Sequence, residues 1–158
     1  MKLSEIVVEK SIVPSLKATT RDDVLVEMMD SLVESGAVAP DQRDEFLAAI
    51  TARENKGSTG FGHGVAVPHA KHASIDKMIV SIANSPEGVE FNALDGQPVH
   101  SIFLLLSPES RPEDHLDAMT VIFNLLKQET FRRFLRNSRS VEDIMVLLEE
   151  ADAGANAR

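Results

Sequence analysis

The sequence contains no cysteine, tryptophan or tyrosine. The absence of cysteine excludes disulfides, thiolate nucleophiles and any zinc or iron–sulfur site built on sulfur. No apolar run approaches the roughly 18 residues that a membrane span requires. The first residues, Met1–Ile6, also lack the apolar core of about 7 or more residues that a secretory signal contains. We therefore expect no membrane insertion, and these features are compatible with a reducing cytoplasm.

Positive charge is scarce, because 16 lysines and arginines face 25 aspartates and glutamates and leave a net charge of −9. Such a balance repels a phosphate backbone, which argues against nucleic acid as a partner. The basic residues are scattered except in segment 131–136, whose Arg132, Arg133 and Arg136 we interpret as a solvated helix face. The glycine-rich segment 60–64 fails the GxGxxG spacing, and no Walker lysine follows a GxxxxG loop, so no nucleotide site is predicted.

Apolar periodicity and capping residues predict one α/β domain over residues 1–150. The predicted helices cover residues 20–35 and about 41–53, a long segment opened by Ser110, and two shorter segments opened by Thr130 and Ser140. The predicted strands cover residues 65–67, 78–83 and 99–106, the last buried on both faces. Residues 151–158 have little to bury and are expected to form a flexible tail. This order of elements predicts a mixed sheet covered by helices.

Residues 53–70 combine the residue types that a phosphoryl acceptor needs. Four glycines within eight residues allow a bulky anion to approach the backbone, and Ser58 and Thr59 offer hydroxyl donors. His69 follows Pro68 where the predicted strand ends. An imidazole with an unperturbed pKa of about 6.5 is largely neutral at pH 7, so one ring nitrogen has a lone pair that can attack phosphorus. His69 is therefore the candidate nucleophile.

A phosphorylated imidazole would carry a group of roughly −1.5 to −2 charge, which nearby donors must match. Arg53 precedes the glycine-rich segment and is one candidate. His115 is the other, because it falls in the first turn of the Ser110 helix, where free backbone N–H groups and the helix dipole favour an anion. Lys56 and Lys71 are interpreted as rim charges.

The same segment resembles the mannitol/fructose-type IIA component, EIIA type 2, of the bacterial phosphoenolpyruvate-dependent sugar phosphotransferase system. The residues that carry the resemblance are Glu54, Phe61, Gly62, Val65, Ala66, Val67, Pro68, His69 and Ala70, supported by Ile12-Val13-Pro14, Ile102–Leu106 and His115-Leu116. The resemblance implies a mixed sheet of about five strands flanked by helices on both sides. It also implies that His69 is phosphorylated through Nε2, with His115 and Arg53 completing the site. The residues expected to line the phosphate pocket are Ser58, Thr59, Glu54, Gly62 and Gly64.

The resemblance further implies a cytoplasmic phosphocarrier without cofactor or metal. Its donor would be a small HPr-type phosphocarrier protein, and its acceptor a IIB domain or a regulatory target protein. Because residues 1–158 include no IIB, membrane IIC or HPr segment, we expect a standalone subunit of the nitrogen-regulatory kind, although a separately encoded sugar-specific IIA would look much the same.

Two other hypotheses remain open at this point. His63, His69 and His72 are close in sequence and could bind a metal, since neutral imidazoles bind zinc. The second hypothesis is a non-catalytic interaction module of the same fold.

Overall fold

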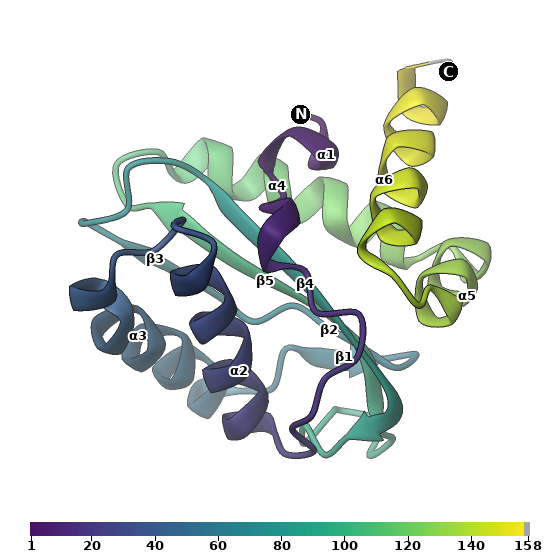
Figure 1. The fold of residues 1–158 in the computed structure, drawn as a ribbon, viewed down its shortest axis with the longest axis horizontal. Helices are drawn as coiled ribbons and strands as arrows, with labels where there is room; N and C mark the ends of the chain where they lie inside the picture. The colour runs from purple at the N-terminus through teal and green to yellow at the C-terminus, as the bar shows by residue number, and fades with distance from the viewer. Residues whose placement is uncertain (157–158) are drawn as a thin grey trace.

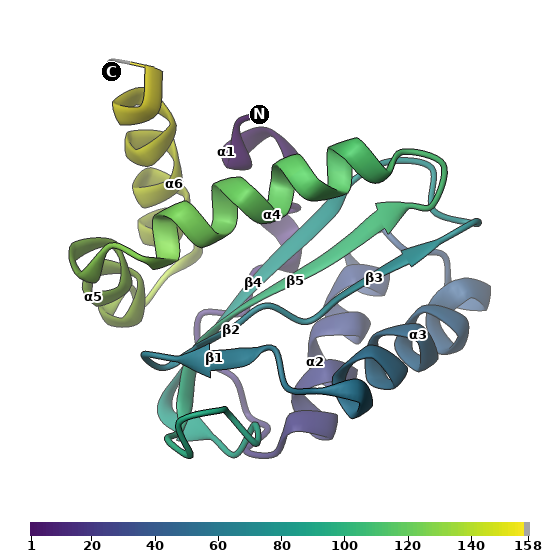
Figure 2. The ribbon, with the colours of Figure 1, turned by 180° about the vertical axis from the view of Figure 1, so that it is seen from behind.

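A mixed five-stranded sheet lies between two layers of helices in the computed structural model, which describes residues 1–156 and the side chains of residues 1–154 (Figures 1 and 2). The helices are α1 (Leu3–Ile6), α2 (Arg21–Glu34), α3 (Arg43–Lys56), α4 (Pro112–Leu126), α5 (Glu129–Asn137) and α6 (Val141–Asn156), with short 3-10 turns η1 (Glu9–Ser11) and η2 (Pro40–Gln42). The strands are β1 (Gly60–Gly62), β2 (Val65–Ala66), β3 (His69–His72), β4 (Ile79–Val89) and β5 (Val99–Pro108). The predicted α/β class, with helices on both sides of a mixed sheet, is confirmed.

Strand β5 is the centre of the sheet. It pairs antiparallel with β4 on one side and parallel with both β2 and β3 on the other, while β1 pairs antiparallel with β2. The register is the same along β2 and β3, because Val65 lies opposite Ser101 and His69 lies opposite Leu105. Strands β2 and β3 are thus collinear, and both pair with the same edge of β5.

Each face of the sheet has its own hydrophobic core. Ile102, Leu104 and Leu106 of β5 pack with the buried faces of α2 and α3. Phe103 and Leu105, which alternate with them, pack with α1, α4, α5 and α6 on the other face. This alternation confirms that the 99–106 run is a strand buried on both faces.

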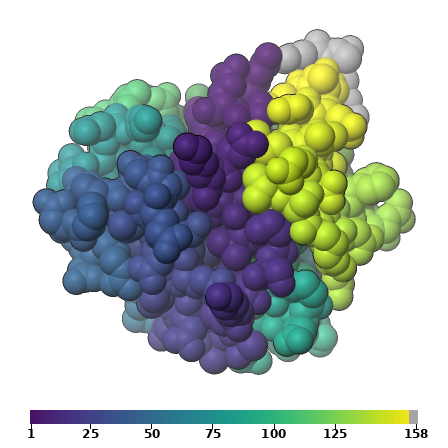
Figure 3. All heavy atoms as spheres, in the orientation of Figure 1, coloured from purple at the N-terminus to yellow at the C-terminus, as the bar shows by residue number. Residues whose placement is uncertain are grey.

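The N-terminal segment runs along the outer edge of β4. In Figure 3 this segment is the purple stretch on the surface, beside the yellow C-terminal helix. Isolated bridges join Val7 to Val80 and Val13 to Ala83, and the Leu16 N–H donates to the Asn84 carbonyl at 2.9 Å. A covered edge cannot pair with another chain. Within residues 1–156, no helix is both long and apolar enough to cross a membrane.

Several predicted helix boundaries differ from the structure. Helix α3 continues past Arg53 to Lys56, and α4 begins after Arg111 rather than Ser110. Thr20 precedes α2 without a side-chain capping bond. Ser140 does cap α6, because its Oγ accepts from the Asp143 N–H at 3.1 Å.

The C-terminal segment differs from the flexible tail predicted for residues 151–158. Helix α6 continues to Asn156, and the nearly buried Asp152 accepts hydrogen bonds from the N–H groups of Leu3 and Ser4, each at 3.1 Å. The carboxylate thereby satisfies free N–H groups at the start of α1, a role that the sequence pattern near residue 152 does not reveal. Residues 157–158 lie outside the described part of the chain.

Candidate functional site

His69 is the first residue of β3, and its half-buried ring is held in one tautomer. Its Nδ1 lies 2.7 Å from the carbonyl oxygen of Val67. A carbonyl can only accept, so Nδ1 carries the proton and donates, which leaves the lone pair of the neutral ring on Nε2. The sequence predicted a strand end at His69. In the structure His69 instead begins β3, which continues along β5 after the interruption at Pro68.

His115 lies beside His69. It belongs to α4, in the helical layer that covers one face of the sheet. The two ring centroids are 5.4 Å apart and the planes are inclined by 50°. His115 Nδ1 is 2.7 Å from the Oγ of the buried Ser107, at the end of β5. Burial is the main reason that the pKa of His115 is lowered to about 4, with smaller contributions from His69 and Lys71, so the ring is neutral at pH 7.

The backbone N–H of His115 is not free for an anion, contrary to the expectation for a first-turn residue. His115 is the fourth residue of α4, and its N–H donates to the Arg111 carbonyl at 3.3 Å. Because the ring is neutral, His115 can stabilise a phosphoryl group only by hydrogen bonding, not by a full positive charge.

An open cavity of ≈ 550 Å³ lies between α3, β3 and the start of α4, and His69 and His115 both line it. Arg53, in the last turn of α3, also lines it and donates from Nη1 to the Gly57 carbonyl at 2.9 Å. Lys56 and Lys71, which we interpreted as rim charges, belong to the lining as well. The structure therefore brings Arg53, His69 and His115 together.

The charge around His69 favours its neutral form. Burial is the largest cause of its lowered pKa, and the positive charges of Arg53 and Lys71 lower the pKa further, against the opposite effect of the hydrogen bond to Val67. The same positive charges would attract an incoming phosphoryl dianion. Glu109 supplies a carboxylate at the edge of the lining.

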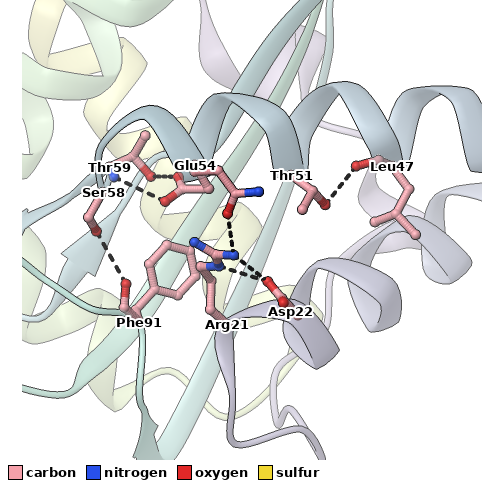
Figure 4. A network of polar contacts seen from close by, with 9 residues as sticks. Arg21, Asp22, Leu47, Thr51, Glu54, Ser58, Thr59 and Phe91 are labelled. Atoms are coloured by element: carbon pink, nitrogen blue, oxygen red, sulfur yellow. Dashed lines mark hydrogen bonds and ion pairs between the residues drawn. The ribbon is translucent and has the colours of Figure 1, made fainter.

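Glu54, Thr59 and Ser58 are not among the residues that line this cavity, and their expected place at the phosphate remains a prediction. Figure 4 shows the contacts that these side chains make instead. The buried Glu54 carboxylate accepts from the Thr59 N–H at 3.2 Å and from the Thr59 hydroxyl, which ties the end of α3 to the residues before β1. Burial raises the pKa of Glu54. The Ser58 hydroxyl donates to the Phe91 carbonyl at 3.2 Å, so it satisfies a local backbone group.

Gly62 and Gly64 shape a hairpin turn, and their expected role in the phosphate pocket remains a prediction. The turn between β1 and β2 places His63 at φ 60° and Gly64 at φ 74°, and Gly62 just before it has φ 120°. Two-residue hairpin turns of type I′ need positive φ at both central residues. The glycines are required for this backbone conformation, and Gly64 lines a different cavity from His69.

Comparisons with known proteins identify the family of the chain. The model of the family "Phosphoenolpyruvate-dependent sugar phosphotransferase system, EIIA 2" matches residues 5–151. The chain belongs to this family. It is 33% identical over 148 residues to a nitrogen regulatory protein of Bradyrhizobium diazoefficiens, covering 94% of this chain and 95% of the relative.

Two further comparisons show the range of the family. The fructose-specific EIIABC component of Bacillus subtilis is 32% identical over 152 residues, which are 96% of this chain and 24% of that longer protein. The crystal structure of the nitrogen regulatory protein IIA-Ntr from Neisseria meningitidis superposes with a TM-score of 0.83 at 29% identity, covering 92% of this chain and 98% of that one. This IIA chain thus spans nearly all of these two nitrogen-regulatory proteins and about a quarter of the fructose-specific one.

The zinc hypothesis required three imidazoles of this IIA protein to converge, and they do not. His63 lies on the hairpin turn, whereas His72 pairs through Nε2 with Glu45 at 2.8 Å and through Nδ1 with the Ser74 N–H at 2.9 Å. No group of three or more potential metal-ligating side chains is found in the described part of the chain.

Ser107 is the residue of the IIA site that the sequence analysis missed. It follows the apolar run of β5 directly, and a fully buried hydroxyl at the end of such a strand needs a partner. That signal could have pointed to a polar contact there. It could not have identified His115, which lies on another element.

Proposed function

We propose that this IIA protein is a phosphocarrier that accepts a phosphoryl group on Nε2 of His69 and passes it to a second protein. The observation that carries the proposal is the hydrogen bond between His69 Nδ1 and the Val67 carbonyl, because it leaves the lone pair on Nε2. Family membership supports a role within the phosphotransferase system. The neighbouring Arg53 and His115 support the position of the site.

The transfer step balances without a separate base. The Nε2 lone pair attacks phosphorus and forms a P–N bond, while the bond from phosphorus to the donor's ring nitrogen breaks and returns its electron pair to the donor. The Nδ1 proton stays on the ring and keeps its bond to Val67. The phosphorylated ring is then cationic and the phosphoryl oxygens are anionic, so Nδ1 donates a charge-assisted hydrogen bond.

The surrounding groups stabilise the transferred group without fixing it permanently. Arg53 supplies the permanent charge at the cavity, and a neutral His115 can donate one hydrogen bond from Nε2. Each charge-assisted hydrogen bond contributes about 1.5–3 kcal/mol. A stronger cage would slow the onward transfer, because the same contacts must release the group to the acceptor.

The proposed donor is a small phosphohistidine carrier of the HPr type, and the proposed acceptor is a IIB domain or a regulatory target protein. We favour regulation, because the nitrogen regulatory relative matches this chain over almost the full length of both. No cofactor or metal is needed in this scheme, since the phosphoryl group arrives on a protein. We also propose a cytoplasmic location, because the proposed donor proteins act in the cytoplasm.

The test is phosphorylation of the purified chain with phosphoenolpyruvate and the general carrier enzymes. We expect one acid-labile phosphate per chain, lost in His69→Ala and retained in His63→Asn, a control histidine in another cavity whose positive φ asparagine tolerates. Phosphorus–nitrogen correlation NMR should place the phosphate on Nε2. Uptake that survives in His69→Ala, or no uptake at all by the native chain, would refute the proposal.

A further inference from the structure

A second cavity, of ≈ 530 Å³, lies at the other end of the sheet and is lined by arginines. Arg132, Arg133 and Arg136 of α5 and Arg139, just before α6, all contribute to it. Arg133 and Arg136 are exposed, as expected for a solvated helix face, and they line a concave space as well. We call this cavity the arginine cavity.

The arginine cavity is remote from the phosphoryl site. His100 of β5 lines it, whereas His69 lies opposite Leu105, five residues further along the same strand. At about 3.3 Å per residue, this separation is roughly 16 Å. A ligand in the arginine cavity would leave His69 free to react.

The positive charges of the arginine cavity are not neutralised by the protein. None of its four guanidinium groups forms an ion pair with a carboxylate among the residues that the structure describes. Arg132 and Arg136 are four residues apart on α5, and like charges at this spacing repel each other. Glu129 contributes a single carboxylate to the lining. The cavity is positive in a chain of net charge −9, so this concentration of charge is local.

Two of the guanidinium groups are held in place by the backbone. Arg132 Nη1 donates to the Leu126 carbonyl at 2.7 Å, and Arg139 Nη1 donates to the Arg136 carbonyl at 2.8 Å. Each guanidinium has five N–H donors, so most remain available to a ligand. The planar fork of a guanidinium matches the oxygens of a phosphate, and an ordered fork loses less entropy when it binds.

The β1–β2 hairpin and β5 supply another wall of the arginine cavity, close to α5 in Figure 2. His63 lies at the tip of the hairpin with φ 60°. The His100 ring is fixed by its Nδ1, which donates to the Ser85 carbonyl at 2.9 Å, and it packs on Gly88, where a Cβ would come within 3.1 Å of Cε1. These imidazoles add polar groups from a second direction, so polar groups line the concave space on two sides.

We propose that the arginine cavity binds a small phosphorylated metabolite that carries at least two negative charges. Its volume lies within the roughly 300–1,000 Å³ that small-molecule sites occupy, and it exceeds what a single phosphate needs. The strongly negative remainder of the chain disfavours a nucleic acid on the same surface. Binding does not use His69, so this inference is independent of the proposed phosphocarrier function.

Isothermal titration of the full chain with pyrophosphate and with magnesium-free ATP, at near-physiological salt, tests the proposal. We expect saturable binding of one equivalent. Arg133→Gln with Arg136→Gln should weaken it about tenfold or more, as expected for lost charge-assisted hydrogen bonds. Neither side chain makes a hydrogen bond among those described, so this double variant is expected to fold, which circular dichroism checks. His63 and His100 should show imidazole shift changes in NMR on binding.

Two controls separate this site from other sources of affinity. Lys10→Gln with Lys77→Gln removes the same charge from exposed positions elsewhere and should leave the affinity unchanged. His69→Ala should also bind normally, even if it no longer takes up phosphate. No saturable binding of either probe, equal weakening by the lysine and arginine variants, or loss of binding in His69→Ala would each overturn the proposal.

Discussion

Removal of the Ser107 hydroxyl tests how the second histidine of the site is oriented. Ser107 is fully buried, and its Oγ lies 2.7 Å from His115 Nδ1. If the hydroxyl donates to Nδ1, both groups are satisfied within the pair, whereas the opposite arrangement leaves the buried hydroxyl proton without an acceptor among the described hydrogen bonds. The first arrangement places the His115 proton on Nε2, where it can donate to a phosphoryl group.

The expected magnitude follows from the value of one neutral hydrogen bond. In Ser107→Ala the His115 ring can adopt the tautomer with the proton on Nδ1, and restoring the productive one costs about 1 kcal/mol. This corresponds to an approximately fivefold slower phosphoryl transfer through His69. Donor affinity should change little, because Ser107 is buried beneath the cavity surface.

Rapid-quench measurement of transfer from the phosphorylated donor, combined with nitrogen NMR of the His115 ring, distinguishes this role from a structural one. The matched control is Ser81→Ala, which removes another fully buried hydroxyl, one that contacts the Ser11 hydroxyl at 2.8 Å. We expect both variants to lose some stability, but only Ser107→Ala to change the tautomer and the rate. A native rate in Ser107→Ala, or an equal slowing in Ser81→Ala, would show that the reasoning is wrong.

Three other predictions follow from the same structure. His115→Ala should slow transfer about 10- to 100-fold while donor binding is largely kept, since one charge-assisted hydrogen bond is lost; equal rates in a single-turnover assay contradict this. The pKa of His69 is lowered from 6.5, chiefly by burial, so the neutral ring persists below that pH. The rate of phosphoryl uptake should therefore reach half of its maximum only below pH 6.5, and a half-maximal rate at or above pH 6.5 would argue against a lowered pKa. Asp152→Ala should lower the free energy of unfolding by about 2–3 kcal/mol, measured in urea, because the α1 N–H groups lose their acceptor; a loss no greater than that of Asp117→Ala, an exposed control on α4, would contradict it.

The elements with strong periodicity could be predicted from the sequence, and the short strands could not. Helix α2 and strand β5 have apolar patterns of the right period, and both formed close to their predicted limits. Strand β3 has only one buried residue, Ala70, between polar neighbours, so no local pattern indicates it. Its extended form comes from pairing with β5, a contact more than thirty residues away in sequence.

The residues of the candidate site also differ in how far the sequence could predict them. His69 and Arg53 lie in one short segment with a recognisable pattern, and the structure places both at one cavity together with His115. The glycine-rich residues between them form a hairpin turn, and the sequence alone cannot tell a backbone that bends around an anion from one that makes such a turn. Ser107 was missed because its contact with α4 exists only after β5 and α4 have packed.

The orientation of the His69 ring depends on the two residues that precede it. Proline restricts the residue before it to extended conformations, so Pro68 limits the directions that the Val67 carbonyl can take. The Pro68 carbonyl accepts from the Leu105 N–H of β5 at 2.9 Å, and because successive carbonyls of a strand alternate, that of Val67 points away from β5. Strand β1 pairs with β2 only as far as Ala66, so no strand there receives this carbonyl, and it is left to accept the proton of His69 Nδ1. The break between β2 and β3 at Pro68 thus selects the tautomer that leaves the lone pair on Nε2 of His69.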